Sequence, residues 1–490
     1  MKRSIPLYII VAATFLLLVG DSLFTTGMFI DGLTYSNIAA NMAEGIGDMW
    51  HPVHSDSIFP HFYEHPTLAM WMLSLFYRVF GTSLWVTRVY AMLIVLITAL
   101  LILRLWKHNG HGADTGWLPL LLWILVPVVT LSSHCILLEC TMAVFVLSAV
   151  LCMMHNSPRR WSRFLWTALG GLFLFLAFLT KGFTGLYPLA FPAILWLTDT
   201  LYPPKERERQ TLGKAVLQTL VLTVSMSLCA AILAICCPEA WDYLGKYIGH
   251  QVIGGMKAPV VDSRWYIIVK FLKQTLIVFA ITAVCLIAAW LTRGKENQTL
   301  PSKEDRHTFL TFLLLTLAGV IPIMVSTKQR DFYILTVFPF LAVALGSLLH
   351  NAVESWLSRA GRTFNLATTA LAVIAVACAV WLNASYYGKP GRDIALQNDM
   401  QLILPCLEEG EHVAIPDCMR EEYSLIYYYY REKKISLMPV SDMGDTTLPY
   451  RHLLTDGTPT GLEGGHIHKV PLKTERYNLF NLQKHKTSQI

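Results

Sequence analysis

The sequence predicts a mainly α-helical, polytopic membrane protein of about eleven transmembrane helices, with a small C-terminal α/β domain outside the membrane. Three observations predict this class. Hydrophobic residues make up 54% of the 490 residues and charged residues only 15%, whereas soluble domains are roughly 25% charged. Apolar runs long enough to cross about 30 Å of hydrocarbon recur along the chain. Basic residues gather in alternate loops, which is typical of a chain with a fixed orientation in a membrane.

Each predicted span is an apolar run that crosses the bilayer as a helix rising about 1.5 Å per residue. In chain order the spans are 6–24, 83–105, 117–134, 136–154, 164–180, 183–199, 216–236, 266–291, 308–326, 332–349 and 364–383. The segment 66–80 is apolar but short, so we expect an interfacial or re-entrant helix there. The first span has a basic start, so a cleaved signal peptide is an alternative. Asp21 and the lack of an Ala-x-Ala-like site favour an uncleaved anchor.

The basic loops predict the orientation. They carry Lys2 and Arg3; Arg104 and Lys107; Arg159, Arg160 and Arg163; Lys205, Arg207, Arg209 and Lys214; Arg293, Lys295, Lys303 and Arg306; and Arg359 and Arg362. The positive-inside rule assigns these loops to the cytoplasm. The loops 25–66 and 237–265 and the tail then face outward. The net charge of +6 therefore reflects orientation in a membrane, and we expect no nucleic-acid partner.

Two domains are predicted. Residues 1–383 form the transmembrane domain, whose first outer loop, 25–66, carries interfacial helices. Residues 384–490 form the outer domain, where the stretches 411–415 and 435–438 have β-strand character. Cys406 and Cys418 lie in this tail and could form a disulfide in an oxidising compartment, with two free thiols as the alternative.

Charged residues at the predicted outer boundary of the membrane are candidates for a functional site, because such positions are costly for charges. Asp31, Glu139, Lys181, Lys328 and Arg330 are the main examples. Arg and Lys can hold the phosphate of an anionic lipid. A carboxylate can take a proton from an acceptor hydroxyl or amine as it attacks a sugar carbon.

Each of these residues also has a purely structural interpretation. Asp31 could cap a helix, and Lys181 could extend to the lipid headgroups. Glu139 could pair with a neighbouring helix, and Lys328 and Arg330 could bind lipid headgroups. Their occurrence on one side of the membrane favours the functional interpretation.

Several short motifs occur in an order known from one enzyme superfamily. They are Asp31-Gly32-Leu33-Thr34-Tyr35, the run from Phe62 to Leu68 with Trp71, Phe80-Gly81, Arg88, Leu138-Glu139, Thr180-Lys181-Gly182, Ser326-Thr327-Lys328, Tyr333-Ile334-Leu335 and Pro339. In these motifs the chain resembles the GT-C glycosyltransferases, in particular the ArnT-like and protein O-mannosyltransferase branch. The resemblance covers about residues 1–350, and members of this branch use polyprenyl-phosphate sugars.

The resemblance implies a role for each site residue. Asp31 matches the catalytic base, and Glu139 matches a second acid. The expected substrate-binding residues are Tyr35, Glu64, His65, Lys181, Lys328, Arg330 and Tyr333, of which Lys181, Lys328, Arg330 and Tyr333 match positions that face the donor phosphate. No cofactor is expected to be required. His250 resembles a histidine that joins a divalent-metal site in some relatives, although a solvated loop histidine is the alternative.

The sequence also departs from the family pattern. Gly32 stands where the second residue of an acidic pair is usual, Thr34 where an Arg is common, and His65 where Lys is usual. Contacts to the donor phosphate are therefore expected to differ locally, which leaves the sugar and the acceptor open.

The expected function is inverting transfer of a sugar from a polyprenyl phosphate, such as undecaprenyl phosphate, to a lipid A, glycan or protein acceptor. The resemblance places the enzyme in a bacterial cytoplasmic membrane, with the N-terminus inside and the tail outside. Its partners would be the lipid-linked donor, the acceptor and membrane lipids. A transporter or flippase of a lipid-linked sugar is the alternative, but the sequence shows no internal inverted repeats. A structural subunit would leave Lys181 and Arg330 without a role.

Overall fold

The computed structural model describes residues 4–155, 157–205, 207–257, 259, 263–291, 299–441, 449–457 and 467–482. The chain divides into two compact units. The helical unit comprises Met1–Leu23, Tyr63–Ala69 and Leu84–Ser385. The tail unit comprises Phe24–Phe62, Met70–Ser83 and Tyr386–Ile490.

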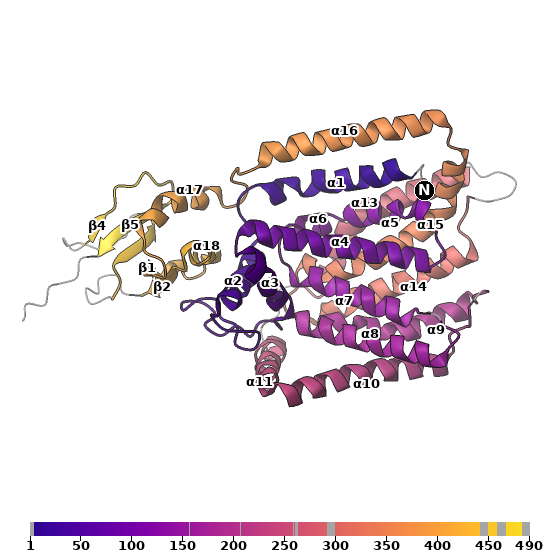
Figure 1. The fold of residues 1–490 in the computed structure, drawn as a ribbon, viewed down its shortest axis with the longest axis horizontal. Helices are drawn as coiled ribbons and strands as arrows, with labels where there is room; N and C mark the ends of the chain where they lie inside the picture. Colours follow the sequence, from indigo (N-terminus) through magenta and orange to yellow (C-terminus); the bar gives the residue numbers. More distant parts are fainter. Residues whose placement is uncertain are drawn as a thin grey trace, which may run out of the picture. The chain divides into compact units, whose positions relative to one another are not determined.

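The helical unit is a bundle of long apolar helices with several shorter helices between them (Figure 1). They are α1 (Ile5–Phe24), α4 (Leu84–His108), α5 (Trp117–Ile124), α6 (Pro127–Ser132), α7 (Leu138–Met153), α8 (Arg160–Lys181), α9 (Phe191–Leu201), α10 (Leu212–Cys236), α11 (Pro238–Tyr247), α12 (Gly254–Lys257), α13 (Tyr266–Leu291), α14 (Lys303–Val320), α15 (Phe338–Arg359) and α16 (Arg362–Tyr386). Within the bundle α7 packs against α4 and α8, and α15 packs against α13 and α14. The protein is therefore a multi-pass membrane protein with the predicted helical class of fold.

Eight segments of the described residues are helical, long and apolar enough to cross a membrane. One of them, Arg160–Leu201, has 42 residues and would extend roughly 60 Å as one helix, about twice the hydrocarbon thickness. It contains the predicted spans 164–180 and 183–199, joined by the 3₁₀ segment η2 (Gly182–Ala190). The predicted span 136–154 corresponds to α7, which is shorter than the other spans.

The prediction of one continuous span over 117–134 is wrong. The structure ends α5 at Ile124 and begins α6 at Pro127, with Val126 extended at φ −79° and ψ 114°. Proline has no N–H for the helical ladder and disfavours helical geometry in the residue before it, so the helix breaks there. This segment therefore contributes two short helices where one was expected.

The tail unit is a mixed α/β structure. It contains α2 (Ile30–Glu44), most of α3 (Leu68–Phe80), α17 (Ile394–Ile403), α18 (Tyr423–Lys433) and the strands β1 (His412–Pro416), β2 (Ser436–Val440), β3 (His452–Asp456), β4 (Ile467–Lys469) and β5 (Tyr477–Leu482). The sheet order is β2-β1-β3-β5-β4, with β2, β1 and β3 parallel and β3, β5 and β4 antiparallel. Ala414, Leu453 and Phe480 form a buried cluster on this sheet. The predicted stretches 411–415 and 435–438 are therefore confirmed as strands.

The unit boundary at Ser385 and Tyr386 falls within a few residues of the predicted boundary at 383 and 384. The tail unit, however, also contains Phe24–Phe62 and Met70–Ser83. The helix α3 takes the place of the expected interfacial helix and exposes the apolar stripe Trp71, Leu75 and Val79. The first outer loop and the tail are thus one compact structure.

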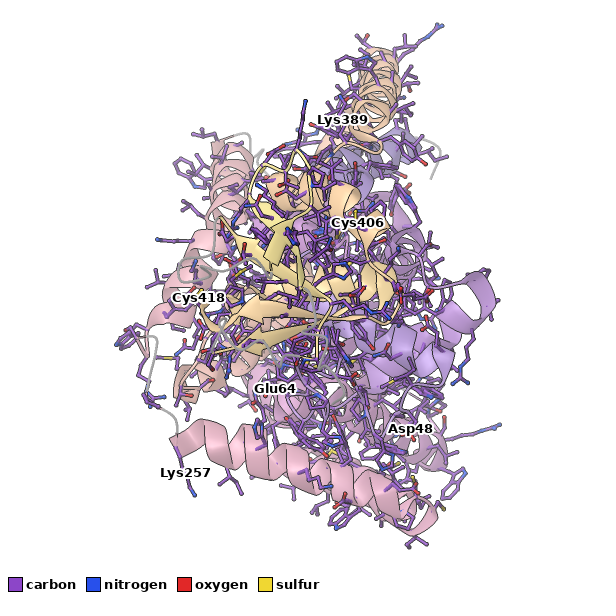
Figure 2. All side chains as sticks on the ribbon, turned by 90° about the vertical axis from the view of Figure 1, so that its left-hand side faces the viewer. Asp48, Glu64, Lys257, Lys389, Cys406 and Cys418 are labelled. Carbon is purple, nitrogen blue, oxygen red and sulfur yellow. The ribbon has the colours of Figure 1, made fainter. Side chains whose placement is uncertain are left out.

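The tail cysteines are free. Cys406 lies in the short segment η6 and Cys418 in η7, and both side chains are exposed. Figure 2 shows the two labelled side chains well apart in the tail unit. Of the two alternatives, the structure therefore has free thiols and no disulfide between them.

Candidate active site

A buried ion pair lies at the centre of the candidate site in the helical unit. Lys181, the last residue of α8, donates its Nζ proton to Oε1 of Glu139 in the first turn of α7. The Lys181 side chain is 5% exposed and the Glu139 side chain 0%. A buried charge needs a partner, and the N-terminus of α7 further favours the carboxylate. The structure therefore brings together two residues that the sequence placed at one membrane boundary.

Two aromatic rings complete the surroundings of Lys181. Its Nζ lies 4.6 Å from the ring centroid of Tyr333 and 5.5 Å from that of Phe332, both on the 3₁₀ segment η5 (Asp331–Val337). Cation–π attraction at these distances holds the ammonium against the ring faces. Tyr333 thus joins Glu139 and Lys181, while the contribution of Phe332 was not predicted.

The chain reverses immediately after Lys181, which places this lysine at the end of a helix rather than inside one. Gly182 has φ +75° and ψ −146°, a conformation open to glycine but strained for other residues. A β-carbon at Gly182 would also lie 2.0 Å from the Tyr247 hydroxyl. Both the backbone angles and the space thus require glycine beside Lys181.

The loop that carries Lys328 and Arg330 is anchored by the residue between them. Gln329 is fully buried, and its Oε1 accepts a 2.9 Å hydrogen bond from the Ile267 N–H. The Ser326 hydroxyl donates to the Lys328 carbonyl at 2.7 Å, and Arg330 Nη1 donates to the Gln329 carbonyl at 3.1 Å. Lys328 is exposed and Arg330 half-buried, so the two cations lie at the surface on either side of the anchor. Sequence reasoning missed Gln329, since an uncharged residue between two cations gives little signal.

The helix α11 and the π-helical segment that follows it (Ile248–Ile253) contact the segment from Tyr63 to His65. The Tyr243 hydroxyl donates to the His65 carbonyl at 2.7 Å, and its ring centroid lies 5.7 Å from that of Tyr63. His250 Nδ1 lies 3.5 Å from Glu64 Oε1. Figure 2 labels Glu64. Tyr243 and Tyr247, one helical turn apart, were not predicted as site residues.

The surroundings of His65 disfavour its charged form. Burial holds the pKa of His65 well below its usual 6.5, and the positive charges of Lys181 and Lys328 lower it further. Lys181 and Lys328, which are distant from His65 in the sequence, therefore both act on this side chain.

Glu64 and His250 are the residues that could hold a metal ion. They supply one carboxylate oxygen and one imidazole nitrogen, and the His250 side chain is 63% exposed. Among the described residues, no group of three or more His, Cys, Asp or Glu side chains is placed to bind a metal. Two such ligands are fewer than the three or four protein ligands that a resident zinc usually has.

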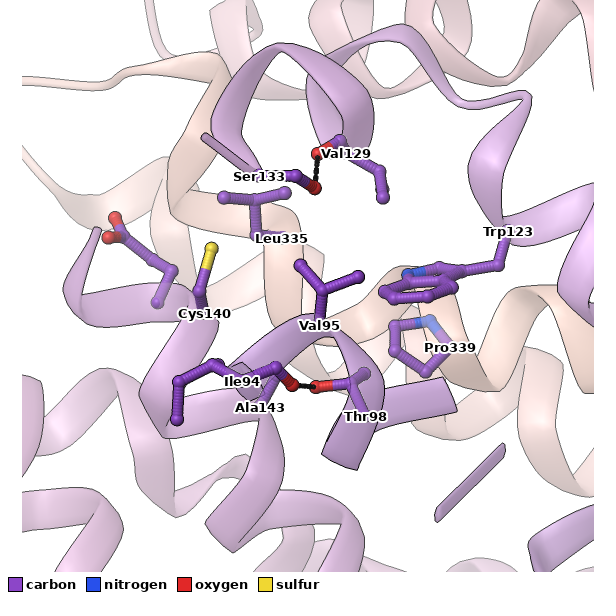
Figure 3. A pocket seen from close by; sticks show the side chains of 11 residues that line it. Ile94, Val95, Thr98, Trp123, Val129, Ser133, Cys140, Ala143, Leu335 and Pro339 are labelled. Atoms are coloured by element: carbon purple, nitrogen blue, oxygen red, sulfur yellow. Dashed lines mark hydrogen bonds between the residues drawn. The ribbon is translucent and has the colours of Figure 1, made fainter. Parts of the chain in front are cut away.

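A small cavity lies behind the ion pair, within the helical unit. Its volume is about 20 Å³, which is room for roughly one water molecule. Its lining residues are Ile94, Val95, Thr98, Trp123, Val129, Ser133, Glu139, Cys140, Ala143, Leu335 and Pro339. Figure 3 shows Trp123, Cys140 and Pro339 around it, with Thr98 and Ser133 bonded to main-chain carbonyls of their own helices. Glu139 thus borders a mostly apolar interior.

Asp31 and Tyr35 belong to the tail unit, whereas the other eight predicted site residues belong to the helical unit. Asp31 is half-buried in the first turn of α2, two residues after the extended Phe29 at φ −62° and ψ 142°. Tyr35 is buried on the same helix, and its ring centroid lies 6.5 Å from that of Phe62 in an edge-on arrangement. Asp31 is thus the more accessible of the two.

Comparisons with known proteins agree with these features. The family model "Dolichyl-phosphate-mannose-protein mannosyltransferase" matches residues 64–235. The undecaprenyl phosphate-alpha-4-amino-4-deoxy-L-arabinose arabinosyl transferase 2 of Proteus mirabilis (strain HI4320) is 23% identical over 272 residues, which are 55% of this chain and 47% of that protein. The chain thus spans about half the length of this curated relative.

The solved structures match nearly the whole chain. ArnT from Cupriavidus metallidurans bound to undecaprenyl phosphate has a TM-score of 0.61 at 16% identity, with 96% of this chain and 97% of that chain covered. The apo state of the same protein has a TM-score of 0.62 at 15% identity, with 97% of each chain covered.

The apolar helices and the structural matches define a polytopic membrane protein. Within that class the fold is that of the ArnT-like glycosyltransferases. The resemblance expected from the motifs is therefore confirmed.

Proposed function

We propose that this chain is an inverting glycosyltransferase that moves a sugar from a polyprenyl phosphate, such as undecaprenyl phosphate, to a lipid, glycan or protein acceptor outside the cytoplasmic membrane. The observation that carries the proposal is the buried Lys181, paired with Glu139 and lying over the ring of Tyr333, with Lys328 and Arg330 on the loop that leads into the same 3₁₀ segment. The bound ligand of the similar ArnT structure, undecaprenyl phosphate, is an anion of the kind such a site attracts. The name of the Proteus relative describes a sugar transferase that uses this lipid.

The cations would bind the phosphate of the donor. Arg330 offers a planar fork of N–H donors, and Lys328 offers a compact charge at the surface. Lys181 Nζ has three donor hydrogens, so the bond to Glu139 leaves others for an oxygen of the phosphate. His65 adds a hydrogen-bonding group without a further charge. Tyr333, Glu64 and Tyr35 complete the proposed substrate contacts.

The reaction would proceed by direct displacement. Asp31 takes the proton of the acceptor hydroxyl or amine while the acceptor atom bonds to the anomeric carbon. The bond from that carbon to the phosphate oxygen breaks, and the polyprenyl phosphate leaves with the electron pair. Lys181, Lys328 and Arg330 stabilise the charge that develops on it. Glu139 is buried against Lys181, so it acts by positioning this lysine.

The proposed location is a bacterial cytoplasmic membrane, with the N-terminus inside and the tail outside. The basic loops from Arg104 to Arg362 support this orientation. Lys2, Arg3, Arg293 and Lys295 lie outside the described residues. The proposed reaction needs no metal, although Glu64 and His250 could bind a divalent ion loosely.

Transfer of a labelled sugar tests the proposal. Membranes with matched amounts of wild type, Asp31→Asn or Arg330→Ala receive labelled polyprenyl-phosphate sugar and a cell-envelope extract. We expect Asp31→Asn to lower the rate by about 10²–10⁴-fold, because the base is lost. Arg330→Ala should lower it by about 10²–10³-fold, because a donor to the leaving oxygen is lost.

Two exposed residues provide matched controls. Asp48 accepts a hydrogen bond from the Trp50 N–H, and Asp48→Asn keeps an acceptor there. Arg420 pairs with Asp417 on the surface, so Arg420→Ala is the control for Arg330→Ala. Asp48→Asn and Arg420→Ala should both retain wild-type transfer. Unchanged transfer by Asp31→Asn would contradict the role of Asp31 as base. No transfer by wild type with several donors would contradict the enzyme assignment and favour a flippase.

A further inference from the structure

The residues before α2, the helix that carries Asp31, are hydrogen-bonded to the first residues of the tail. Both segments belong to the tail unit. The Thr26 N–H donates to the Lys389 carbonyl at 2.7 Å, and the Gly391 N–H donates to the Thr26 carbonyl at 3.2 Å. Gly27 has φ +96°, and a β-carbon there would lie 3.0 Å from Cβ of Arg392. The residues before α2 are therefore fixed by main-chain bonds and close packing.

Tyr428 forms a second set of hydrogen bonds to this segment, closer to Asp31. Its hydroxyl accepts a 2.7 Å hydrogen bond from the Met28 N–H and donates a 3.2 Å bond to the Met28 carbonyl. Both side chains are buried, where main-chain polar groups need partners. One hydroxyl thus fixes the peptide groups on both sides of Met28, three residues before Asp31.

The rest of α18 packs against α2. The contacts are Asn37 Nδ2 to the Tyr427 carbonyl at 3.0 Å, the Tyr430 hydroxyl to Asn41 Oδ1 at 3.2 Å, Arg431 Nη1 to the Ser36 carbonyl at 3.0 Å, and Lys434 Nζ to Asn41 Oδ1 at 2.7 Å and Glu44 Oε2 at 2.9 Å. These bonds set the position of α2 along α18. The bond of Tyr428 to Met28 sets its N-terminal end.

We infer that Tyr428 is a positioning residue for Asp31 and that the tail is therefore part of the catalytic apparatus. The inference rests on the proposed function, in which Asp31 is the base. A catalytic group must be held within roughly 0.5 Å of its productive place, and a misplacement of about 1 Å can cost 10²-fold in rate. Without the Tyr428 hydroxyl, the first turn of α2 would lose the bond that fixes its approach.

The neighbouring Tyr429 provides a matched control. It is fully buried on the same helix, and its hydroxyl has no hydrogen-bond partner among the described residues. Loss of an unpaired buried hydroxyl costs little stability. Tyr429→Phe therefore removes the same atom as Tyr428→Phe, from a similar environment, without touching Met28.

The experiment compares wild type, Tyr428→Phe and Tyr429→Phe by steady-state transfer and by hydrogen–deuterium exchange of the residues around Met28. We expect Tyr428→Phe to lower kcat by about 10–100-fold and to speed exchange of the Met28 amide. KM for the donor should change less than kcat, because Lys181, Lys328 and Arg330, which would bind the donor phosphate, are intact. Tyr429→Phe should match wild type in kcat and exchange.

A second variant guards against a folding defect in Tyr428→Phe. A β-carbon at Gly391 would lie 2.1 Å from the Thr25 hydroxyl. Gly391→Ala should therefore disturb the main-chain bonds between Thr26 and the tail. We expect it to lower kcat more than it changes KM. Faster exchange in Tyr428→Phe with full kcat would overturn the inference, as would an equal loss of kcat in Tyr429→Phe. Absence of transfer by wild type would instead overturn the proposed function, and the inference with it.

Discussion

Lys181 and Glu139 form a buried pair of opposite charges. Each charge is costly inside the protein, and each makes the other tolerable. Lys181 is therefore held at one point, where its ammonium also contacts the ring of Tyr333. A group fixed in this way needs little rearrangement to meet an anionic substrate.

Breaking this pair from one side should be costly. We expect Glu139→Gln to destabilise the folded protein by about 3–5 kcal/mol, because Lys181 would remain buried without its counter-charge. The double variant Glu139→Gln with Lys181→Met should lie closer to wild type than Glu139→Gln does. Denaturant unfolding of the detergent-solubilised protein measures both. Glu208→Gln, which removes the charge of an exposed partner of Arg163 and Lys214, should leave the stability nearly unchanged.

A histidine of the tail unit predicts acid sensitivity. His54 is fully buried, and burial with the charge of Lys434 lowers its pKa to about 3. Below about pH 6.5 the unfolded chain binds a proton that the folded chain does not, so stability falls as pH falls from about 6.5 to 3. The loss approaches about 1.4 kcal/mol per pH unit within that window.

Unfolding at pH 7.5 and pH 5 measures this effect. His54→Gln, which keeps a polar side chain beside Asn37, should reduce the pH dependence. His51→Gln is the control, because the His51 side chain is 60% exposed. Equal pH dependence in wild type and His54→Gln would contradict the assignment to His54.

Sequence reasoning identified charged residues better than neutral ones. Glu139 and Lys181 were recognisable because charges near a membrane have few ways to be satisfied. The sequence did not identify Gln329, Tyr243 or Tyr428. Each of them binds a main-chain group of a distant residue, and the sequence does not show which main-chain groups lie nearby. A run of four tyrosines gives no sign of which hydroxyl reaches a distant carbonyl.

Among the elements, the reversal between α8 and η2 depends on a glycine with a positive φ. Gly182→Ala would place a β-carbon against Tyr247 in a backbone conformation that suits glycine. We expect a loss of at least about 1–3 kcal/mol from backbone strain, with lower transfer because Lys181 would shift. Unfolding and transfer assays measure the two effects.

The control for Gly182→Ala lies in α10. Gly213 has ordinary helical angles, and open space surrounds its α-carbon. Gly213→Ala should be neutral or stabilise the protein by up to about 1 kcal/mol. If Gly182→Ala were equally harmless, the strained reversal would not be required.

The elements that the sequence predicted well are long and strongly apolar, such as α4, α10 and α13. The error at 117–134 came from Pro127, whose effect on helical geometry outweighed an otherwise continuous apolar run. Hydrophobicity alone reports that a segment lies in the membrane, whereas its hydrogen-bonding pattern decides how many helices it forms. A single proline thus decides where an apolar segment is divided into two helices.

On the scale of the whole molecule, the sequence predicted the chain position where the tail unit takes over after α16, but not what the tail joins. The recruitment of Phe24–Phe62 and Met70–Ser83 into the tail unit depends on pairings between residues hundreds of positions apart. Composition and periodicity are local properties and carry no information about such pairings.

The orientation gives a further prediction. If the tail faces outward, a membrane-impermeant maleimide should label the exposed Cys406 and Cys418 in intact spheroplasts. The double variant Cys406→Ser with Cys418→Ser should lose the label at these two positions, as peptide mass analysis would show. In that background, Lys205→Cys in a basic loop should react only after the membrane is opened. Labelling of Lys205→Cys in sealed spheroplasts would reverse the orientation.

The bond between Met28 and Tyr428 also has a consequence for the time at which the protein can fold. The two residues are 400 positions apart in the sequence. At a synthesis rate of about 5–20 residues per second, the ribosome needs roughly 20–80 s to make the chain between them. During that interval α2 has been synthesised, but α18, which packs against it, has not. One of the first segments to leave the ribosome is thus among the last to reach its final structure, and a nascent chain that ends before Tyr428 never completes it.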